Sequence, residues 1–486
     1  MTNSQIGEQS RANEPYRKAY VFTLVINAAL GSFFFGFTLA VFNPIQNFIS
    51  KYVYPDISNN LLYLATSCVP AGAAIGGLIA GSLSNSYGRK NAMRIIDLVT
   101  IVGIFMEVLS SKYLLILGRL LNGLCLGLNC TLVPIYISEV SPISVKGVAG
   151  TFNQLFLSIG MLVAFVLGLG VPKEGSDPDS NWWRVMLGFP LITCTIRILL
   201  LTFVFREDTP RYSIARGKDE EAIRALQKIY KGDYSQEIFD SLKRENEILS
   251  SQGKMSYSEL FSPNMRKRVF AGVVLAIFQQ LVGMNAIVFY SVTIFEQQSS
   301  GDEALAQIYT AVVGIIGLVA AIFASFIISK VGRKTILFTG CTLMGITMTL
   351  FSILSYESDG KSDLLKYCIF VYTGAFGFSL GPVVWIYVSE VLPDLGVGIA
   401  TLMNWISSFI IAQGFPYLLK AFGQNWCFVP FAVTSFLGCI FVLTCLKETK
   451  DKSDVEISRA FDPKEKKVAE LNGIEASVGF LNDSTS

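Results

Sequence analysis

Twelve long apolar stretches constrain this chain more than any other feature. Each has about 20 mostly apolar residues, which is the length that an α-helix needs to cross a bilayer. Their hydropathy does not alternate, as it would in the strands of a membrane barrel. We therefore predict an all-α polytopic membrane protein with twelve transmembrane helices. The stretches are 19–41, 61–84, 92–110, 114–135, 148–171, 184–205, 267–291, 304–328, 335–356, 366–388, 397–419 and 427–446.

The placement of Lys and Arg predicts the orientation of the chain. Because the number of spans is even, both termini lie on one side of the membrane. Of the 39 Lys and Arg residues, 30 fall in the termini and in the connections on that same side. Cytoplasmic segments carry such an excess. We therefore predict an integral membrane protein of the plasma membrane with both termini in the cytoplasm.

A long polar connection divides the spans into two sets of six. The predicted organisation is a cytoplasmic N-tail at 1–18, a six-helix bundle at 19–205, a cytoplasmic linker at 206–266, a second six-helix bundle at 267–446 and a cytoplasmic C-tail at 447–486. Within the linker, apolar residues recur at helical spacing over 220–232 and 236–249. This spacing predicts two amphipathic helices, with a largely solvated linker as the alternative.

Composition excludes several classes of function. The chain has no His, so it can hold neither a Ser-His-Asp triad nor a His-ligated zinc ion. We find no metal-ligand cluster, nucleophile–base pairing or phosphate-binding loop, and therefore predict no enzyme, no cofactor and no metal. A net charge of +2 gives no reason to expect a nucleic-acid partner. No obligate protein partner is evident, and we expect the protein to be embedded in the lipid bilayer.

The two halves of the chain share motifs at matching places. GRK at 88–90, after the second span, returns at 332–334 after the eighth. IYISEVSP at 135–142, after the fourth span, returns as IYVSEVLP at 386–393 after the tenth. Such a repeat predicts two homologous, pseudo-symmetric six-helix bundles. Transporters built on this plan bind their substrate between the halves.

The repeated motifs place charges at the cytoplasmic ends of the helices. Basic residues after spans 2 and 8 face acids after spans 4 and 10, and 207–209 after span 6 is echoed by Glu448-Thr449 after span 12. We predict that these charges latch the two halves together in one state, and so bias a two-state equilibrium. The alternative is that GRK only marks the cytoplasmic side. The predicted network comprises Arg89, Lys90, Glu139, Lys146, Asp208, Arg211, Arg333, Lys334, Glu390 and Glu448.

Several segments together resemble the sugar porter family of the major facilitator superfamily. The longest are GSLSNSYGRKN (81–91), VPIYISEVSP (133–142), QQLVGMNAIVFYS (279–291) and GPVVWIYVSEVLP (381–393), with GRLLNG, EDTPR, SKVGRKT, NW and KETK between and after them. The match extends over residues 19–450 and is nearest to facilitative hexose (glucose) transporters. It implies the major facilitator fold, alternating access and a small sugar as substrate.

Amide side chains in the spans are the candidate sugar ligands. Amides both donate and accept hydrogen bonds, as sugar hydroxyls require, and polar side chains in spans tend to face the bundle interior. In span 7, Gln279, Gln280 and Asn285 fall within one broad arc of a helix. Each amide can instead link neighbouring helices. The resemblance implies that the hexose is bound at Gln154, Gln279, Gln280, Asn285 and Trp385, with Asn404 near the site.

Two segments are candidate gates. Phe289 and Tyr290 end span 7 on the outer side, where the resemblance implies an aromatic half-helix that folds over the bound sugar. Gly381 and Pro382 interrupt span 10. A proline inside a span frees a backbone carbonyl and permits bending. We predict a second mobile helix there, with a fixed structural kink as the alternative.

The intramembrane charges bear on proton coupling. The resemblance implies that proton-coupled relatives carry an Asp in span 1 opposite an Arg in span 4. Here residues 36–38 read Gly-Phe-Thr, while Arg119 remains, which favours facilitated diffusion. The acids within spans are Asp97 and Glu107. Glu107 and Arg119 lie at similar depth on either side of a turn, so we predict that they form a neutralising pair. Proton coupling through this pair is the alternative.

The leading hypothesis is thus a facilitative hexose (glucose-like) transporter that works as a uniporter by alternating access. A proton-coupled sugar or polyol (inositol) symporter and a non-transporting sugar sensor are the alternatives. Gly317 stands where relatives often have an Asn that reads sugar, and Val282 departs from the Gln-Leu-Ser motif associated with glucose. These departures leave the preferred sugar open.

Overall fold

All twelve predicted spans are helical in the computed structural model, which describes residues 15–173, 177–252, 256–263, 265–299, 301–358 and 362–461. Within these residues, ten helical segments are long and apolar enough to cross a membrane. The other two spans are α5, which carries several charged side chains, and α21, which has 16 residues. Residues 1–14 and 462–486 of the predicted tails lie outside the described residues.

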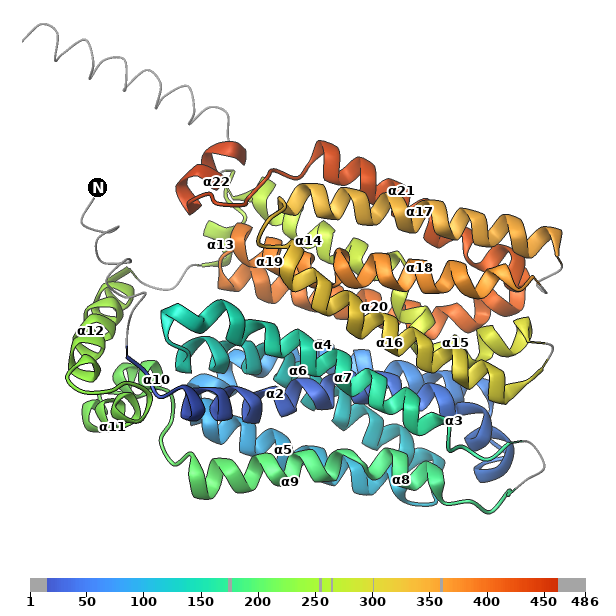
Figure 1. Ribbon diagram of the computed structural model, residues 1–486, viewed down its shortest axis with the longest axis horizontal. Helices are drawn as coiled ribbons and strands as arrows, with labels where there is room; N and C mark the ends of the chain where they lie inside the picture. The colour runs from blue at the N-terminus through green and yellow to red at the C-terminus, as the bar shows by residue number, and fades with distance from the viewer. Residues whose placement is uncertain are drawn as a thin grey trace, which may run out of the picture.

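The helices run along the long axis of the molecule and form two bundles, of which the first lies below the second in Figure 1. The first bundle holds α2 (Lys18–Ala40), α3 (Phe42–Phe48), α4 (Asn59–Tyr87), α5 (Arg89–Val108), α6 (Lys112–Val140), α7 (Lys146–Gly168), α8 (Trp182–Gly188) and α9 (Pro190–Leu199). The second holds α14 (Arg266–Leu281), α15 (Met284–Gln298), α16 (Glu303–Ile327), α17 (Arg333–Glu357), α18 (Leu364–Phe378), α19 (Leu380–Val391), α20 (Asp394–Cys427) and α21 (Val429–Thr444).

Small residues allow the helices to pack closely. A Cβ added to Gly36 of α2 would overlap the carbonyl oxygen of Leu157, and one added to Gly160 of α7 would overlap that of Phe33. The backbones of α2 and α7 therefore touch, as in other membrane helix pairs whose interfaces are rich in small residues. Between the bundles, α4 packs against α20 and α7 against α16, and these pairs border the space between the halves.

Short helices cover one end of the bundles, at the left of Figure 1. They are α10 (Pro210–Ala215), α11 (Asp219–Ile229), α12 (Tyr234–Gln252), α13 (Tyr257–Leu260) and α22 (Asp454–Phe461). The two amphipathic linker helices are confirmed as α11 and α12, and α11 buries Ala222, Leu226 and Ile229. The helices α10 and α11 pack on the first bundle, whereas α13 and α22 pack on the second. The linker region is thus shared between the bundles.

Candidate functional site

Span 7 is broken at its centre. The helix α14 ends at Leu281 and α15 begins at Met284. Between them Gly283 has a φ of +92°, and a Cβ there would lie 2.5 Å from the ring of Phe431, so only glycine fits. The break leaves carbonyl groups that need partners away from water. Thr434 Oγ1 donates to the Leu281 carbonyl at 2.9 Å, and the Tyr372 hydroxyl donates to that of Val282.

The break brings three predicted sugar-binding residues into one network of amides. Gln280 Nε2 donates to Asn404 Oδ1 at 3.0 Å. Asn285 Nδ2 donates to Gln280 Oε1 at 2.6 Å and to Ser408 Oγ at 2.8 Å. These side chains come from α14, α15 and α20, which are far apart in the sequence. Ser408 was not among the predicted residues. It lies four residues after Asn404 on the same helix, and this spacing could have placed its hydroxyl on the same helix face as Asn404.

Gln279 has a different environment from its neighbour Gln280. Its Nε2 donates to the carbonyls of Leu380 and Gly381 at 2.8 and 3.1 Å, and its Oε1 accepts from Asn404 Nδ2 at 2.8 Å. The two carbonyls lie where span 10 is broken between α18 and α19, at Ser379 with φ −118° and ψ −92°. Gln279 therefore ties the break in span 10 to the amide network, and both of its N–H groups are used there.

Two hydrogen-bonding groups of the amide network have no partner among the described residues and are available to a ligand. Both N–H groups of Asn285 are donated, but within the described residues nothing donates to its Oδ1. Gln280 donates one N–H to Asn404 and so retains a second one. A free acceptor and a free donor thus lie five residues apart, on either side of the break. This pairing suits two neighbouring hydroxyl groups, each of which can donate and accept.

Two predicted ligands lie outside the network. Gln154 on α7 and Trp385 on α19 are both half-buried, and neither side chain has a hydrogen bond to a described residue. Next to Gln154, Asn153 Oδ1 accepts from Ser32 Oγ at 2.5 Å. Trp405 is buried against Phe35, with ring centroids 5.7 Å apart. The structure thus assembles the α14–α15–α20 part of the predicted site and leaves Gln154 and Trp385 without partners.

The predicted outer gate is a second bend in span 7. Phe289 and Tyr290 are buried, and Tyr290 has non-helical angles of φ −135° and ψ 16°. At this bend Asn43 of α3 donates from Nδ2 to the Val288 carbonyl at 2.8 Å and accepts from the Val292 N–H at 3.2 Å. Val288 and Val292 are four residues apart, as the two partners of a helical hydrogen bond are. A side chain of the first bundle thus bridges two backbone groups of the second at this bend.

Further polar contacts join the bundles at the same end. Ser67 Oγ donates to Gln413 Oε1 at 2.6 Å, and Asn47 Nδ2 donates to Glu296 Oε2 at 2.9 Å. Tyr417 of α20 donates to Asn60 of α4 at 2.8 Å. These contacts close the end of the molecule opposite α10–α12. Sequence reasoning missed Asn43, although an Asn beside Pro44 inside an apolar run was a usable signal.

The charge motifs form two matching clusters at the α10–α12 end. In the first bundle Arg89 binds Glu139 at 2.9 Å, and Asp208 accepts from the backbone N–H of Arg89 at 3.1 Å. Thr209 Oγ1 also donates to Glu139. Burial raises the pKa of the Asp208 carboxyl above its usual range, although the N–H groups of Thr209 and Lys90 oppose the shift. This cluster ties the ends of α4, α5 and α6 to the segment after span 6.

The second bundle repeats the cluster residue for residue. Arg333 binds Glu390 at 2.8 Å, and Glu448 accepts from the backbone N–H groups of Arg333 and Lys334 at 2.8 and 3.1 Å. Thr449 Oγ1 donates to Glu390 at 2.6 Å. Glu448 therefore corresponds to Asp208, and the repeated segment aligns Asp208-Thr209 with Glu448-Thr449.

These pairs brace each bundle and do not join the bundles, which corrects the prediction of a latch between the halves. Arg89 and Glu139 both belong to the first bundle, and Arg333 and Glu390 to the second. Arg211 pairs with Glu245 of α12 at 2.9 Å. Lys146 is exposed and has no ion pair with a described residue.

The predicted Glu107–Arg119 pair does not form. Glu107 Oε1 accepts from Asn122 Nδ2 at 2.8 Å. Arg119 donates from Nε to the Ala65 carbonyl at 3.1 Å and from Nη1 to the Thr38 carbonyl at 3.4 Å, and no described carboxylate lies within 4 Å of it. Depth along the helices placed the two residues correctly, but depth alone did not give their direction around the helix axis.

A different buried ion pair was missed. Arg197 of α9 donates from Nε and Nη2 to the two oxygens of Asp97 on α5, at 2.7 and 2.5 Å. Both side chains are at most 2% exposed. A bidentate contact of this kind neutralises two charges inside the bundle. The signal was that each charge sits in an apolar span and needs a partner.

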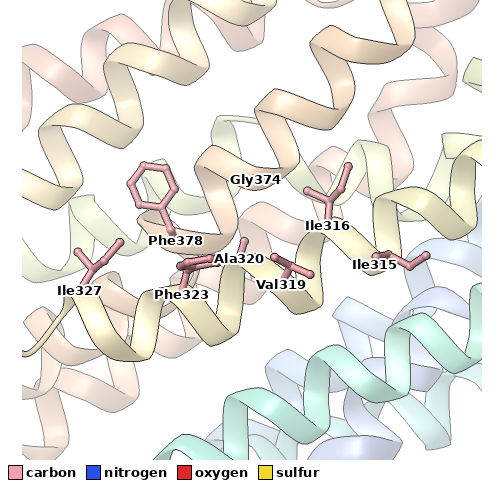
Figure 2. Close-up of a pocket in the computed structure, with 8 residues that line it drawn as sticks. All are labelled: Ile315, Ile316, Val319, Ala320, Phe323, Ile327, Gly374 and Phe378. Carbon is pink, nitrogen blue, oxygen red and sulfur yellow. The ribbon is translucent and has the colours of Figure 1, made fainter.

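A separate hollow lies between α16 and α18 (Figure 2). Its volume is about 400 Å³, and the residues around it are Ile315, Ile316, Val319, Ala320, Phe323, Ile327, Gly374 and Phe378. Figure 2 shows only hydrocarbon side chains there. Such a lining offers no hydrogen bonds to hydroxyl groups, so this hollow is not a sugar site.

Comparison with known proteins decides the family. The family model described as "Sugar (and other) transporter" matches residues 24–461. The chain belongs to the sugar transporter family. The arabinose-proton symporter of Bacillus subtilis is 30% identical over 468 residues, which cover 94% of this chain and 98% of that protein. Facilitated glucose transporter member 3 of solute carrier family 2 from Oryctolagus cuniculus is 31% identical, with 90% of this chain and 91% of that protein covered.

Solved structures agree on the fold. The proton:xylose symporter XylE of E. coli, solved with 6-bromo-6-deoxy-D-glucose, matches with a TM-score of 0.77 at 24% identity, covering 92% of this chain and 100% of that chain. The protein is therefore a multi-pass membrane transporter for a small sugar, with the major facilitator fold of two six-helix bundles. It is a transporter and not an enzyme, as predicted.

Proposed function

We propose that this sugar transporter is a facilitative hexose carrier. The observation that carries the proposal is the amide network at the break of span 7, with its free Asn285 Oδ1 and its free Gln280 N–H. Together they present one acceptor and one donor, without charge, to adjacent hydroxyl groups of a pyranose. Gln154 and Trp385 complete the site from the facing helices, by a hydrogen bond and by stacking on the sugar's C–H face.

Uniport is the proposed mode because no carboxylate of the described residues lies within 4 Å of Arg119. Its guanidinium donates to the backbone carbonyls of Thr38 and Ala65 and stacks on Phe42, with 4.8 Å to the ring centroid. Thr38 stands where proton-coupled relatives are expected to have an Asp. A hydroxyl in that place does not titrate in the physiological range, so sugar movement follows its own gradient.

The same geometry supports a proposed cycle. The contacts of Asn43, Ser67 and Tyr417 close the end opposite α10–α12, which we take as the outer side of the plasma membrane, with both termini in the cytoplasm. The bundles at 19–205 and 267–446 rock about the sugar, and the bends at Tyr290 and Ser379 let spans 7 and 10 close over it. The clusters of Arg89 and Arg333 hold each bundle together while it moves.

The test is uptake of labelled glucose, fructose, xylose and inositol into cells that lack hexose carriers. We expect saturable glucose or fructose uptake that stops at equilibrium and is unchanged by a proton uncoupler. Gln280→Leu should abolish it, while Ile248→Ala, an exposed linker position, should not. Uptake confined to inositol, or accumulation that the uncoupler abolishes, would overturn the proposal.

Proton symport is the second candidate, and one observation favours it. Glu107 is buried in the same bundle as Arg119, and among the described residues the donor to its carboxylate is the neutral amide of Asn122. A carboxylate in that position can take up a proton. Sugar-evoked alkalinisation outside the cells that is lost in Glu107→Gln would establish it.

A further inference from the structure

Asp97 and Arg197 form a buried ion pair to which the transport cycle proposed above gives no role. Two charges inside a membrane bundle are costly and usually serve the function of the protein. The pair is bidentate, and the remaining Arg197 Nη1 donates to Asn129 Oδ1 of α6 at 2.9 Å. The guanidinium thus links α5, α6 and α9.

The same guanidinium also lies against α2. A Cβ added to Gly31 would overlap Arg197 Nη1 and would lie 2.5 Å from Asn129 Oδ1. Glycine at this position is what lets the α2 backbone reach the charged group. The position of α2 is therefore set by the ion pair together with Asn129.

From α2 the contacts lead to the sugar site. Ser32, the residue after Gly31, donates to Asn153 Oδ1 at 2.5 Å. Asn153 precedes Gln154 on α7, the one amide of the first bundle that we expect to bind sugar. The glycine contacts at Gly36 and Gly160 press the backbones of α2 and α7 together, so α7 follows any displacement of α2.

We infer that the Asp97–Arg197 pair is a positioning element for the first bundle's half of the sugar site. It holds α2 in place, and α2 holds the segment of α7 that carries Asn153 and Gln154. The effect on the sugar rests on the proposed function. The effect on α2 and α7 does not.

Two variants test the inference by different routes. Asp97→Leu combined with Arg197→Met removes both charges, a replacement that is often neutral for stability. Gly31→Ala keeps both charges and places a methyl group where Arg197 Nη1 lies, so α2 and the guanidinium must move apart. For both we expect the KM for glucose to rise about tenfold, which corresponds to ~1.4 kcal/mol of lost binding, with kcat within about twofold. Thr100→Val is the control, since this buried hydroxyl of α5 donates to the Ile96 carbonyl of its own helix and, among the described residues, has no hydrogen bond to Asp97 or Arg197.

Hydrogen–deuterium exchange of the purified full-length protein gives a readout that needs no sugar. Exchange should rise in α2 and α7 of both variants and stay unchanged in α14–α21. Unchanged exchange in α7, or a fall in thermal midpoint with an unchanged KM, would overturn the inference and leave the pair a structural brace. If the wild type transports neither glucose nor fructose, the proposed function fails, and the exchange result still decides the inference.

Discussion

The Asn43 contact at the bend of α15 gives the sharpest prediction about the gate. Asn43→Ala removes the hydrogen bonds that Asn43 makes to the Val288 carbonyl and the Val292 N–H at the bend of α15. Burying an unsatisfied polar group costs ~1–3 kcal/mol. In an open state the two groups are four residues apart and free to bond to each other, so the cost falls on the closed state alone. The closed-to-open ratio should therefore fall by about five- to 150-fold.

Thiol labelling from outside measures that ratio. Thr66 of α4 is buried in the closed outer end, so Thr66→Cys should react slowly with a membrane-impermeant maleimide. Adding Asn43→Ala should accelerate the reaction by the same factor as the shift in population. Asn43→Asp should have a smaller effect, because its carboxylate still accepts from the Val292 N–H but no longer donates to the Val288 carbonyl.

Asn47→Ala is the matched control. Asn47 lies one helical turn further along, and its bond to Glu296 is only partly buried, so water can replace the lost partner. Labelling should change by less than about threefold, a difference of under ~0.7 kcal/mol. Equal labelling rates in the wild type and Asn43→Ala, in folded protein of normal melting behaviour, would refute the account of the gate given above.

Three further predictions concern the site and the charges. Asn285→Ala should raise the KM for sugar about tenfold or more in uptake assays, because the sugar loses the Asn285 Oδ1 acceptor and Gln280 loses the hydrogen bond that orients it. An unchanged KM would show that Asn285 is not part of the site. Arg89→Ala should lower the free energy of unfolding by about 1–3 kcal/mol, and by more than Arg333→Ala does, because the Glu139 side chain left unpaired is 10% exposed and that of Glu390 is 26% exposed. Thermal denaturation of the two variants in detergent compares these losses, and a larger loss for Arg333→Ala would contradict the reasoning. Thr38→Asp should place a titratable carboxyl group beside Arg119 and make uptake depend on pH, whereas Thr38→Val should leave the pH profile flat. Identical profiles would show that Arg119 cannot be recruited to proton coupling.

Features governed by local sequence were predictable. The length of the apolar stretches predicted the spans, and the helical spacing of apolar residues predicted α11 and α12. The repeated GRK and SEV motifs predicted that both bundles carry equivalent charge clusters. An interruption of span 10 was predictable because Pro382 marks it, although the structure places the break at Ser379, and Gly381 and Pro382 lie in the first turn of α19. The break at Gly283 was not predictable, because it depends on the left-handed glycine and on the approach of Phe431 from span 12.

Features governed by helix packing were not predictable from one sequence. Glu107 and Arg119 lie at similar depth, but helix rotation directs one to Asn122 and the other to backbone carbonyls. Asp97 and Arg197 are far apart in the chain, and their pairing requires α5 and α9 to be neighbours. The charge motifs indicated which residues pair but not whether a pair lies within a bundle or between two.

One helix connects the proposed sugar site to the proposed outer gate. Asn285, which keeps the free acceptor, lies only three residues before Val288, whose carbonyl Asn43 holds. One turn of α15 joins Asn285 to Val288, so a sugar that binds Asn285 and moves it also moves the Val288 carbonyl that Asn43 holds. Gln280 lies beyond the hinge at Gly283 and stays with α14. A sugar that bridges Gln280 and Asn285 therefore fixes the angle across the hinge, and that angle decides whether Asn43 can reach Val288. Binding and closure then become one event, which is the coupling that alternating access requires.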